Sequence, residues 1–511
     1  MVAGTQVNDL TPSEMHASLA RSSALVGDAE GTMHHLDHIS QALSGNPALA
    51  AQMAEIRELL ESEDLGDAAR PSSAPCSFPE SVLQLRPTRN ICNLGGLLPM
   101  AALKHPLENI RVIDLGRHQA GPRCAQVLAR MGAEVIKVER LGGEETRYHG
   151  PWVKKQSSYW VQYNSGKKSL AMDLRKEEGK EALRKLIKVS DVLVQNFRPG
   201  TIEKMGFGYE ELKKLNPRII MVNVSAYGQF GPYSDQIGYD PIGQTMSGIT
   251  MLTGDDGMPP IRTGVPIIDR ITSLHAAIGC LAALHEREVS GEGQSMDVCL
   301  ADTGYSMTEI PITAYHGSGI KPKRGDSNST APPSGIYPCK EGWVLLSAGD
   351  QHHWYRVCNA LGKPEWLEDP RFNTRPERAK NAAIVNEALN ELLSTMTMEQ
   401  AIAHFTEHDV VAAPVNDIPM AEADPHPWER RAMVEVDDFL AGTIAVSGDY
   451  WHFSRTPVNI GVTPKVGEHN DEVLSDILGY SAEEIEEFKK NNVISEEHLY
   501  DEVVGAPDRP K

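Results

Sequence analysis

The chain has 511 residues, and its 49 Lys and Arg residues against 70 Asp and Glu residues give a formal net charge of −21. This length predicts two or three domains, and an apolar fraction of 41% is sufficient for a sizeable core. The acidic excess argues against broad binding to nucleic acid or to anionic membranes. A local basic site for an anionic ligand is compatible with this composition.

Cysteine usage and hydropathy indicate the compartment. The seven cysteines are scattered, without the paired spacing of a zinc site or a disulfide framework. Residues 1–16 lack the basic and apolar regions of a secretory signal, and the chain contains no run of about 18 apolar residues. We therefore expect a cytoplasmic protein that binds no metal and does not span a membrane.

The N-terminal part of the chain is predicted to be an extension. Apolar residues at helical spacing predict helices within residues 1–65, and a Pro- and Ser-rich linker begins at residue 66. The linker leads into a segment, up to residue 107, whose structure the pattern does not indicate.

After this segment, short apolar strands alternate with amphipathic helices. The first unit is a strand at 110–116, a helix at 121–133 and a strand at 134–140, and the alternation continues to a strand at 218–228. Such alternation predicts a mostly parallel sheet covered by helices on both faces. The fold class is therefore predicted to be α/β, with the first part of a large domain at 108–325.

The pattern changes in the second half of the chain. Residues 326–429 contain a predicted strand at 341–349 and a helical pattern at 382–408, which indicates a smaller α+β domain. Strand and helix signals of the large domain resume over 430–490, and residues 491–511 are a predicted tail.

Several motifs of familiar chemistry are incomplete. The turn after the first strand lacks the glycines of a dinucleotide-binding loop, and NSGKKS at 164–169 lacks the first glycine of a P-loop, where Val161 stands. His34 and His38 share a helical face without a third ligand, and we find no nucleophilic serine elbow. Nicotinamide cofactors, nucleotide hydrolysis, metal chemistry and serine hydrolysis are therefore not expected.

Asp269 occupies a position that allows two interpretations. It follows the apolar run at 265–268 and precedes a small-residue, apolar segment with helical character. One interpretation is that Asp269 caps this helix. The other is that it is a nucleophile, because a partly desolvated carboxylate can attack a thioester or an anhydride. The two are compatible, since a helix N-terminus stabilises an anion and would keep the carboxylate ionised.

The order of motifs over about residues 108–480 resembles the class III coenzyme A transferases, the family of formyl-CoA transferase and carnitine CoA-transferase. The matching stretches include VIDLGRHQAGP, NSGKKSLAMDLR, VLVQNFRPGTIEKMGF, GYDPIGQ, GVPIID and GEHNDEVL. The resemblance implies a Rossmann-like large domain, a small domain and an interlocked homodimer. It also implies an acyl-CoA:carboxylate CoA-transferase that uses CoA as a substrate, without a tightly bound cofactor.

In this family the acid of the GVPIID position is the nucleophile, which is Asp269 here. The resemblance implies that Asp269 attacks the acyl-CoA thioester and forms a mixed aspartyl anhydride. The released CoA thiolate then forms an aspartyl-CoA thioester, from which CoA passes to an acceptor carboxylate. By the same resemblance, the CoA-binding residues are Gln119, Arg140, Met172, Arg175, Asn196, Phe197, Lys204 and Met205.

Three positions depart from the family pattern. Formyl-CoA transferase has Arg where Lys204 stands, and its glycine-rich lid has no counterpart in the comparable segment at 323–338. The racemases of this fold carry a His base where this chain has Tyr239, and an unperturbed Tyr titrates near about pH 10. Transfer is therefore favoured over two alternatives, which are racemisation on the same fold and non-catalytic CoA binding.

The substrate pocket is predicted to include Tyr239 and Asp240. An acidic acceptor would need a basic partner, for which Arg117, Arg262 and Arg270 are the candidates. The sequence identifies neither the acyl-CoA donor nor the carboxylate acceptor.

Overall fold

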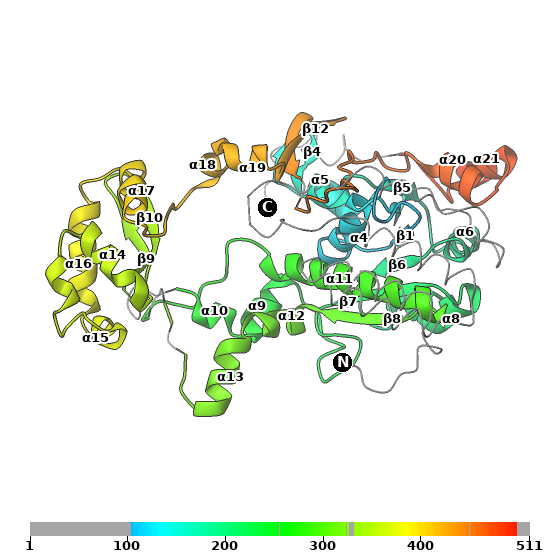
Figure 1. Ribbon diagram of the computed structural model, residues 1–511. Helices are drawn as coiled ribbons and strands as arrows, with labels where there is room; N and C mark the ends of the chain where they lie inside the picture. The colour runs from blue at the N-terminus through cyan, green and yellow to red at the C-terminus, as the bar shows by residue number, and fades with distance from the viewer. Residues whose placement is uncertain (1–103, 255, 323, 326–331, 449, 498–511) are drawn as a thin grey trace, which may run out of the picture. The chain divides into compact units, whose positions relative to one another are not determined.

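The computed structural model describes residues 104–254, 256–322, 324–325, 332–448 and 450–497 (Figure 1). The predicted N-terminal helices, the linker, His34 and His38 lie outside the described residues, as do most of the tail and the centre of the segment compared with the family's lid. Within the described ranges, the chain forms one larger sheet, one smaller sheet and two hairpins.

The larger sheet consists of six strands: β1 (Arg111–Asp114), β2 (Glu134–Glu139), β5 (Lys168–Ala171), β6 (Val192–Gln195), β7 (Ile220–Ser225) and β8 (Ser295–Cys299). All are parallel, in the order β5-β2-β1-β6-β7-β8. In the centre, Val112 of β1 lies beside Val135 of β2 and Val192 of β6. The parallel α/β sheet predicted from the sequence is therefore confirmed.

Helices cover both faces of this sheet, among them α4 (Ala120–Arg130), α6 (Glu177–Lys188), α8 (Tyr209–Leu215), α11 (Ile267–Ser290) and α21 (Ala482–Lys490). Successive strand side chains point to opposite faces, so each face has its own apolar core. On one face Val112 packs with Leu128 of α4 and Ala277 of α11. On the other face Ile113 packs with Leu183 of α6.

Helix α11 is the one helix in the described part of the chain that is long and apolar enough to span a membrane, with a mean hydropathy of 1.4. It reaches this value without a continuous run of 18 apolar residues, because polar residues such as Thr272 and His275 interrupt it. Ala276, Cys280 and Leu284 of this helix are buried in the core that contains α4 and β7. This packing accounts for the apolar composition of the helix.

The smaller sheet is antiparallel and consists of β9 (Ser334–Pro338), β10 (Trp343–Ser347) and β11 (Ala412–Pro414). Its core contains Val344 of β10, Leu389 of α16 (Ala382–Leu393) and Phe405 of α17 (Met398–Glu407). The helical pattern predicted at 382–408 is therefore two helices. A capping box between Thr397 and Gln400 starts the second one.

After residue 430 the chain returns to the larger sheet. Nη1 of Arg130 in α4 donates a hydrogen bond to the carbonyl of Gly448 at 2.8 Å, just after the hairpin of β12 (Met433–Asp438) and β13 (Gly442–Ser447). Farther on, the amide of Ala171 at the end of β5 donates to Oδ1 of Asn470 at 2.9 Å. These bonds tie the C-terminal segment to the elements that carry the site.

Candidate active site

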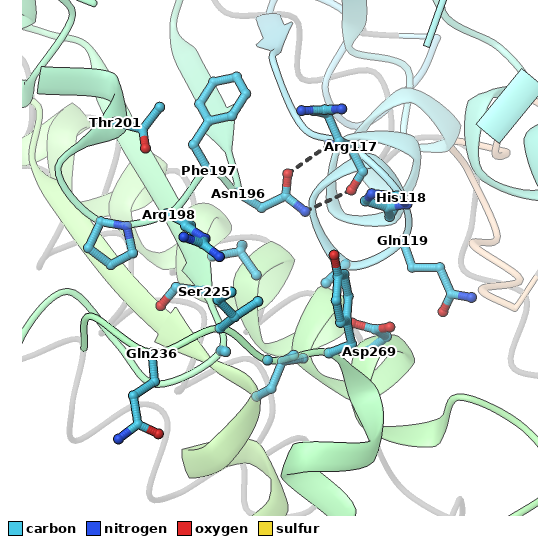
Figure 2. A pocket seen from close by; sticks show the side chains of 18 residues that line it. Arg117, His118, Gln119, Asn196, Phe197, Arg198, Thr201, Ser225, Gln236 and Asp269 are labelled. Carbon is cyan, nitrogen blue, oxygen red and sulfur yellow. Dashed lines mark hydrogen bonds between the residues drawn. The ribbon is translucent and has the colours of Figure 1, made fainter. Parts of the chain in front are cut away.

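A cavity of about 420 Å³ lies at the carboxyl ends of the central strands (Figure 2). β1 connects to β2 on one side of the sheet and β6 connects to β7 on the other, so the gap between β1 and β6 is a switch point of the kind at which parallel sheets bind ligands. The cavity is lined by residues 117–120, 196–199, 201, 224–226 and 236–239, and by Asp269 and Leu300.

Asp269 lines this cavity from the first turn of α11. The N-cap of the helix is Pro266, and the exposed amides of the first turn are satisfied by Asp240, which begins α9 (Asp240–Met246). Oδ2 of Asp240 accepts hydrogen bonds from the backbone N–H groups of Ile268, at 2.7 Å, and of Asp269, at 3.2 Å. The interpretation of Asp269 as the capping residue is therefore wrong, because a carboxylate from another segment performs that role.

The surroundings of Asp269 disfavour its charged form. Burial, and then the negative charge of Asp240, raise the pKa of Asp269 to about 7. No described side chain donates a hydrogen bond to its carboxylate. The expectation that the helix N-terminus keeps Asp269 ionised is therefore wrong, because about half of the molecules would carry the protonated acid at neutral pH. Once ionised, a carboxylate with a raised pKa is a better nucleophile than an ordinary one.

Two further polar side chains lie near Asp269. Gln119, the residue before α4, lines the cavity at 6% exposure, and its Oε1 is buried without a hydrogen-bond partner in the described structure. Tyr159 belongs to α5 (Ser158–Asn164), and burial, followed by the charge of Asp269, raises the pKa of its hydroxyl. Sequence reasoning identified Gln119 but missed Tyr159, because the surrounding QSSYWVQYN contains no recognisable motif.

A second cavity of about 630 Å³ adjoins the first, since Arg117 and Phe197 line both. Two of its cations reach toward solvent: the side chain of Arg140 is 59% exposed and that of Arg175 is 89% exposed. The predicted CoA-binding residues that line it are Arg140, Met172, Arg175, Phe197 and Met205. Gln119 and Asn196 line the first cavity, again with Phe197.

Some predicted residues lie elsewhere. Lys204 ends α7 (Thr201–Lys204) and lines neither cavity. Tyr239 lines the first cavity, with its ring 6.0 Å from that of His118 in an edge-on contact. Asp240 faces a separate hollow of about 600 Å³, which it shares with Arg262.

The basic residues of the first cavity differ from the predicted candidates. Of the three, only Arg117 lines it, and its guanidinium is paired with Glu145. Arg198 also lines it, and its side chain has no ion pair or hydrogen bond with any described residue. Arg198 follows Asn196 by two residues in the NFRPG stretch, so the position of that motif after β6 was the available signal.

The sequence matches the family described as CoA-transferase family III over residues 107–470. It is 36% identical to succinyl-CoA–D-citramalate CoA-transferase of Chloroflexus aurantiacus over 394 residues, which are 76% of this chain and 98% of that relative. It is 31% identical to formyl-CoA:oxalate CoA-transferase of Escherichia coli over 416 residues, which are 76% of this chain and 99% of the relative.

The fold is similar to that of a solved CAIB/BAIF family protein from Brucella suis. The TM-score is 0.67 at 31% sequence identity, over 73% of this chain and 99% of that one. The chain therefore belongs to CoA-transferase family III, and it is an enzyme of CoA transfer. The family predicted from the order of motifs is confirmed.

Proposed function

We propose that the protein is an acyl-CoA:carboxylate CoA-transferase in which Asp269 carries the covalent intermediates. The observation that supports this most is the position of Asp269. Its partly buried carboxylate, which accepts no hydrogen bond from a described side chain, lines a cavity that adjoins a larger one with exposed cations at its wall. A reactive carboxylate beside a site for a long anionic substrate is what the covalent route requires.

The route consists of balanced exchanges at carbonyl carbons. The Asp269 carboxylate attacks the donor thioester, so that a C–O bond forms, the C–S bond breaks and CoA thiolate leaves. The thiolate attacks the aspartyl carbonyl of the anhydride and releases the donor acid. The acceptor carboxylate then displaces CoA from the aspartyl thioester, and the thiolate attacks the acceptor carbonyl. This last step forms the product thioester and regenerates Asp269.

The two cavities suggest where CoA lies. The exposed guanidinium groups of Arg140 and Arg175 in the larger cavity suit the phosphates of CoA. The pantetheine arm would then pass Phe197 and Arg117, which line both cavities, and bring its sulfur to Asp269. The side chain of Gln119 hydrogen-bonds to the hydroxyl of Tyr159, and its remaining N–H and that protonated hydroxyl are the donors available to the oxyanion that forms at the attacked carbonyl.

The acyl group and the acceptor are proposed to be small and acidic. The guanidinium of Arg198, which no described residue pairs, would bind a second carboxylate in the Asp269 cavity. The relatives named for succinyl-CoA with D-citramalate and for formyl-CoA with oxalate act on acids of this kind. Succinyl-CoA is therefore the first donor to test, against a panel of small dicarboxylates.

The experiment that tests the covalent route combines trapping with substitution. The wild-type protein, incubated with succinyl-CoA and then hydroxylamine, should carry a hydroxamate at Asp269 by peptide mass spectrometry. Asp269→Asn should abolish both the adduct and transfer. Glu178→Gln is the matched control, because Glu178 is also a first-turn acid, in α6, but lines neither cavity. Full transfer activity in an Asp269→Ala variant would refute the route.

Racemisation is the second candidate, because one imidazole does line the cavity. His118 lies in the same cavity as Asp269, and burial lowers the pKa of its ring, so the neutral base is present at pH 7. A racemase would exchange the α-proton of an acyl-CoA with solvent in the absence of any acceptor. Deuterium at the α-carbon under those conditions would support this candidate, and transfer without exchange would exclude it.

We propose that the enzyme acts as a homodimer in the cytoplasm. Helix α13 (Glu309–Ser318) has no buried residue, although Ile310 and Tyr315 are 76% and 50% exposed. An exposed apolar helix of this kind is typical of an interaction surface. Size-exclusion chromatography with light scattering should give twice the chain mass of 56.0 kDa. A monomer at working concentration would contradict the proposal.

A further inference from the structure

His118 has a backbone conformation that residues other than glycine rarely adopt. Its φ is 62°, in the left-handed region, and the next residue, Gln119, lines the cavity with Asp269. A left-handed residue here turns the chain from the end of β1 into α4. Because histidine by itself favours negative φ, the surrounding structure has to hold this conformation.

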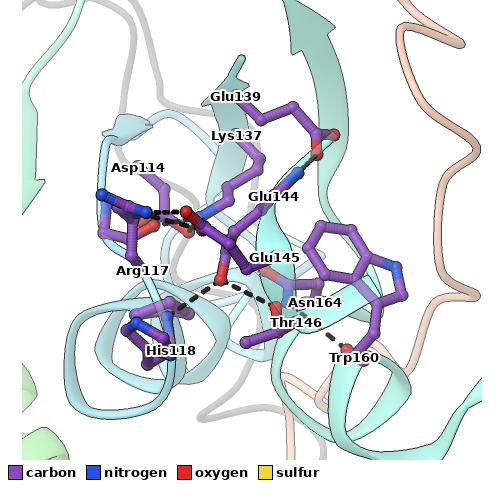
Figure 3. Close-up of polar contacts among 12 residues, drawn as sticks. Asp114, Arg117, His118, Lys137, Glu139, Glu144, Glu145, Thr146, Trp160 and Asn164 are labelled. Atoms are coloured by element: carbon purple, nitrogen blue, oxygen red, sulfur yellow. Dashed lines mark hydrogen bonds and ion pairs between the residues drawn. The ribbon is translucent and has the colours of Figure 1, made fainter. Parts of the chain in front are cut away.

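Glu144 contacts the backbone at this point. Its Oε1 accepts a hydrogen bond from the backbone N–H of His118 at 2.9 Å and another from the hydroxyl of Thr146 at 2.7 Å. Its Oε2 pairs with Nζ of Lys137 at 2.6 Å, and the two side chains are 3% and 1% exposed (Figure 3). A buried carboxylate, fixed from two sides, therefore faces the amide of the left-handed residue.

The neighbouring peptide groups are held as well. The carbonyl of Gly116 accepts a hydrogen bond from Lys137. Asn196 accepts from the N–H of Arg117 and donates to its carbonyl, each at 2.7 Å. The turn that precedes Gln119 is thus restrained at three consecutive residues, and at His118 the restraint is Glu144. Glu144 does not line the cavity of Asp269, but it lines the larger cavity together with Lys137.

We propose that Glu144 is a positioning residue for CoA transfer: through the amide of His118 it fixes the β1–α4 turn so that Gln119 faces Asp269. The proposal rests on the proposed function, in which Gln119 stabilises the oxyanion. Without this acceptor the amide of His118 loses its buried partner, and the residue relaxes toward negative φ. Gln119 then moves away from the reacting carbonyl, while the cations of the CoA cavity stay in place.

The test begins with Glu144→Asp. Aspartate keeps the charge beside Lys137 but is one methylene shorter, so it does not reach the His118 amide. We expect kcat to fall by about tenfold to a hundredfold, and the Kd of CoA by calorimetry to change by less than about threefold. Thr146→Val is the matched control, because it removes the other bond to Oε1 and leaves the His118 bond intact. It should retain kcat within about twofold.

A second pair of variants tests whether Glu144 affects kcat through the backbone conformation of His118. His118→Gly and His118→Ala both remove the imidazole, but only glycine adopts a φ of 62° without strain. With Glu144 present, their kcat values should differ by about twofold. In the Glu144→Asp background, the glycine variant should exceed the alanine variant by about tenfold. Equal ratios in the two backgrounds would overturn the proposal.

Hydrogen exchange of the full-length protein gives a readout that does not depend on turnover. A peptide spanning 115–120 should exchange faster in Glu144→Asp than in the wild type, and at the wild-type rate in Thr146→Val. Unchanged exchange in Glu144→Asp would overturn the proposal. A wild-type protein without CoA transfer would refute the proposed function instead, and the exchange data would still report on Glu144.

Discussion

Asp269 and Asp240 have different surroundings although they lie close together. Asp240 is 5% exposed, and its oxygens accept hydrogen bonds from two backbone amides and from Nε2 of Gln244, the latter at 2.5 Å. Asp269 is partly buried beside this negative charge and has no hydrogen-bond donor of its own among the described side chains. The pair therefore contains one structural carboxylate and one whose charge is opposed by its environment.

This environment predicts the pH dependence of transfer. In the proposed route Asp269 reacts as the carboxylate, so kcat/KM for the acyl-CoA should fall as the pH drops through about 7 and level off above it. Asp240→Asn removes the neighbouring charge, and the midpoint should move to lower pH, although burial still opposes ionisation. The measurement is the rate between about pH 5 and about pH 9. An unchanged midpoint in this variant would show that Asp240 does not tune Asp269.

The same residue should reduce the stability of the fold. Asp269 ionises near 3.8 in the unfolded chain and at about 7 in the folded protein, so folding stability is lost as the pH rises between these values. We expect Asp269→Asn to increase the free energy of unfolding by about 1 to 3 kcal/mol at pH 8 and by much less at pH 4. Urea denaturation at both pH values tests this. An equal gain at both would contradict the electrostatic explanation.

The identity of Asp269 as the candidate nucleophile could be predicted from the sequence because a motif surrounds it. The raised pKa of Asp269 could not be predicted in this way. Asp240 lies 29 residues away along the chain, and only the fold brings the oxygen of Asp240 to the Asp269 amide. For the same reason the sequence suggested that Asp269 caps its own helix. That Arg198 has no ion-pair partner among the described residues is likewise a property of its spatial neighbours.

At the scale of elements, the site depends on a close contact between α9, which begins with Asp240, and α12 (Leu300–Met307). A Cβ on Gly304 of α12 would lie 2.4 Å from the carbonyl oxygen of Gly243 in α9. A Cβ on Gly243 would lie 2.5 Å from a methyl carbon of Ile268 in α11. These glycines allow three helices to meet where Asp269 is held.

Gly304→Ala should therefore destabilise the protein, because the added methyl group overlaps the backbone of α9. We expect a loss of about 1 to 3 kcal/mol in the free energy of unfolding, together with lower transfer activity. Gly264→Ala is the control, since its Cβ meets no atom within 4 Å and its φ lies outside the left-handed region. That change should be neutral or slightly stabilising. Thermal unfolding that ranks the two variants the other way would refute this account of the contact.

The strands and helices of the larger sheet could be predicted because their period and apolar content are local properties. The order β5-β2-β1-β6-β7-β8 could not, since it depends on pairings between distant segments. The helical pattern at 382–408 was predicted without the break that divides it, although that break depends on local residues. Both halves are amphipathic, and only the Thr397–Gln400 capping box divides them.

At the scale of the whole molecule, the described residues bring the candidate nucleophile and two adjoining cavities to the carboxyl ends of a parallel sheet. The segment after residue 430 supports this edge from a distance in sequence, for example through the bond between Arg130 and Gly448. Motif order predicted the family, and most of the site residues it singled out line one of the two cavities. Which residues meet in which cavity required the fold, as Lys204 and Arg198 illustrate.

The buried charges beneath the β1–α4 turn predict how CoA transfer depends on ionic strength. The side chains of Asp114, Lys137, Glu144 and Lys167 are at most 3% exposed, so dissolved ions screen their pairs only weakly. The guanidinium groups of Arg140 and Arg175 are open to solvent, where screening is strong. Raising sodium chloride from about 0.05 M to about 0.5 M should increase KM for the acyl-CoA severalfold and change kcat by less than about twofold. Salt would thus weaken the encounter with the substrate and leave the geometry of its reaction intact.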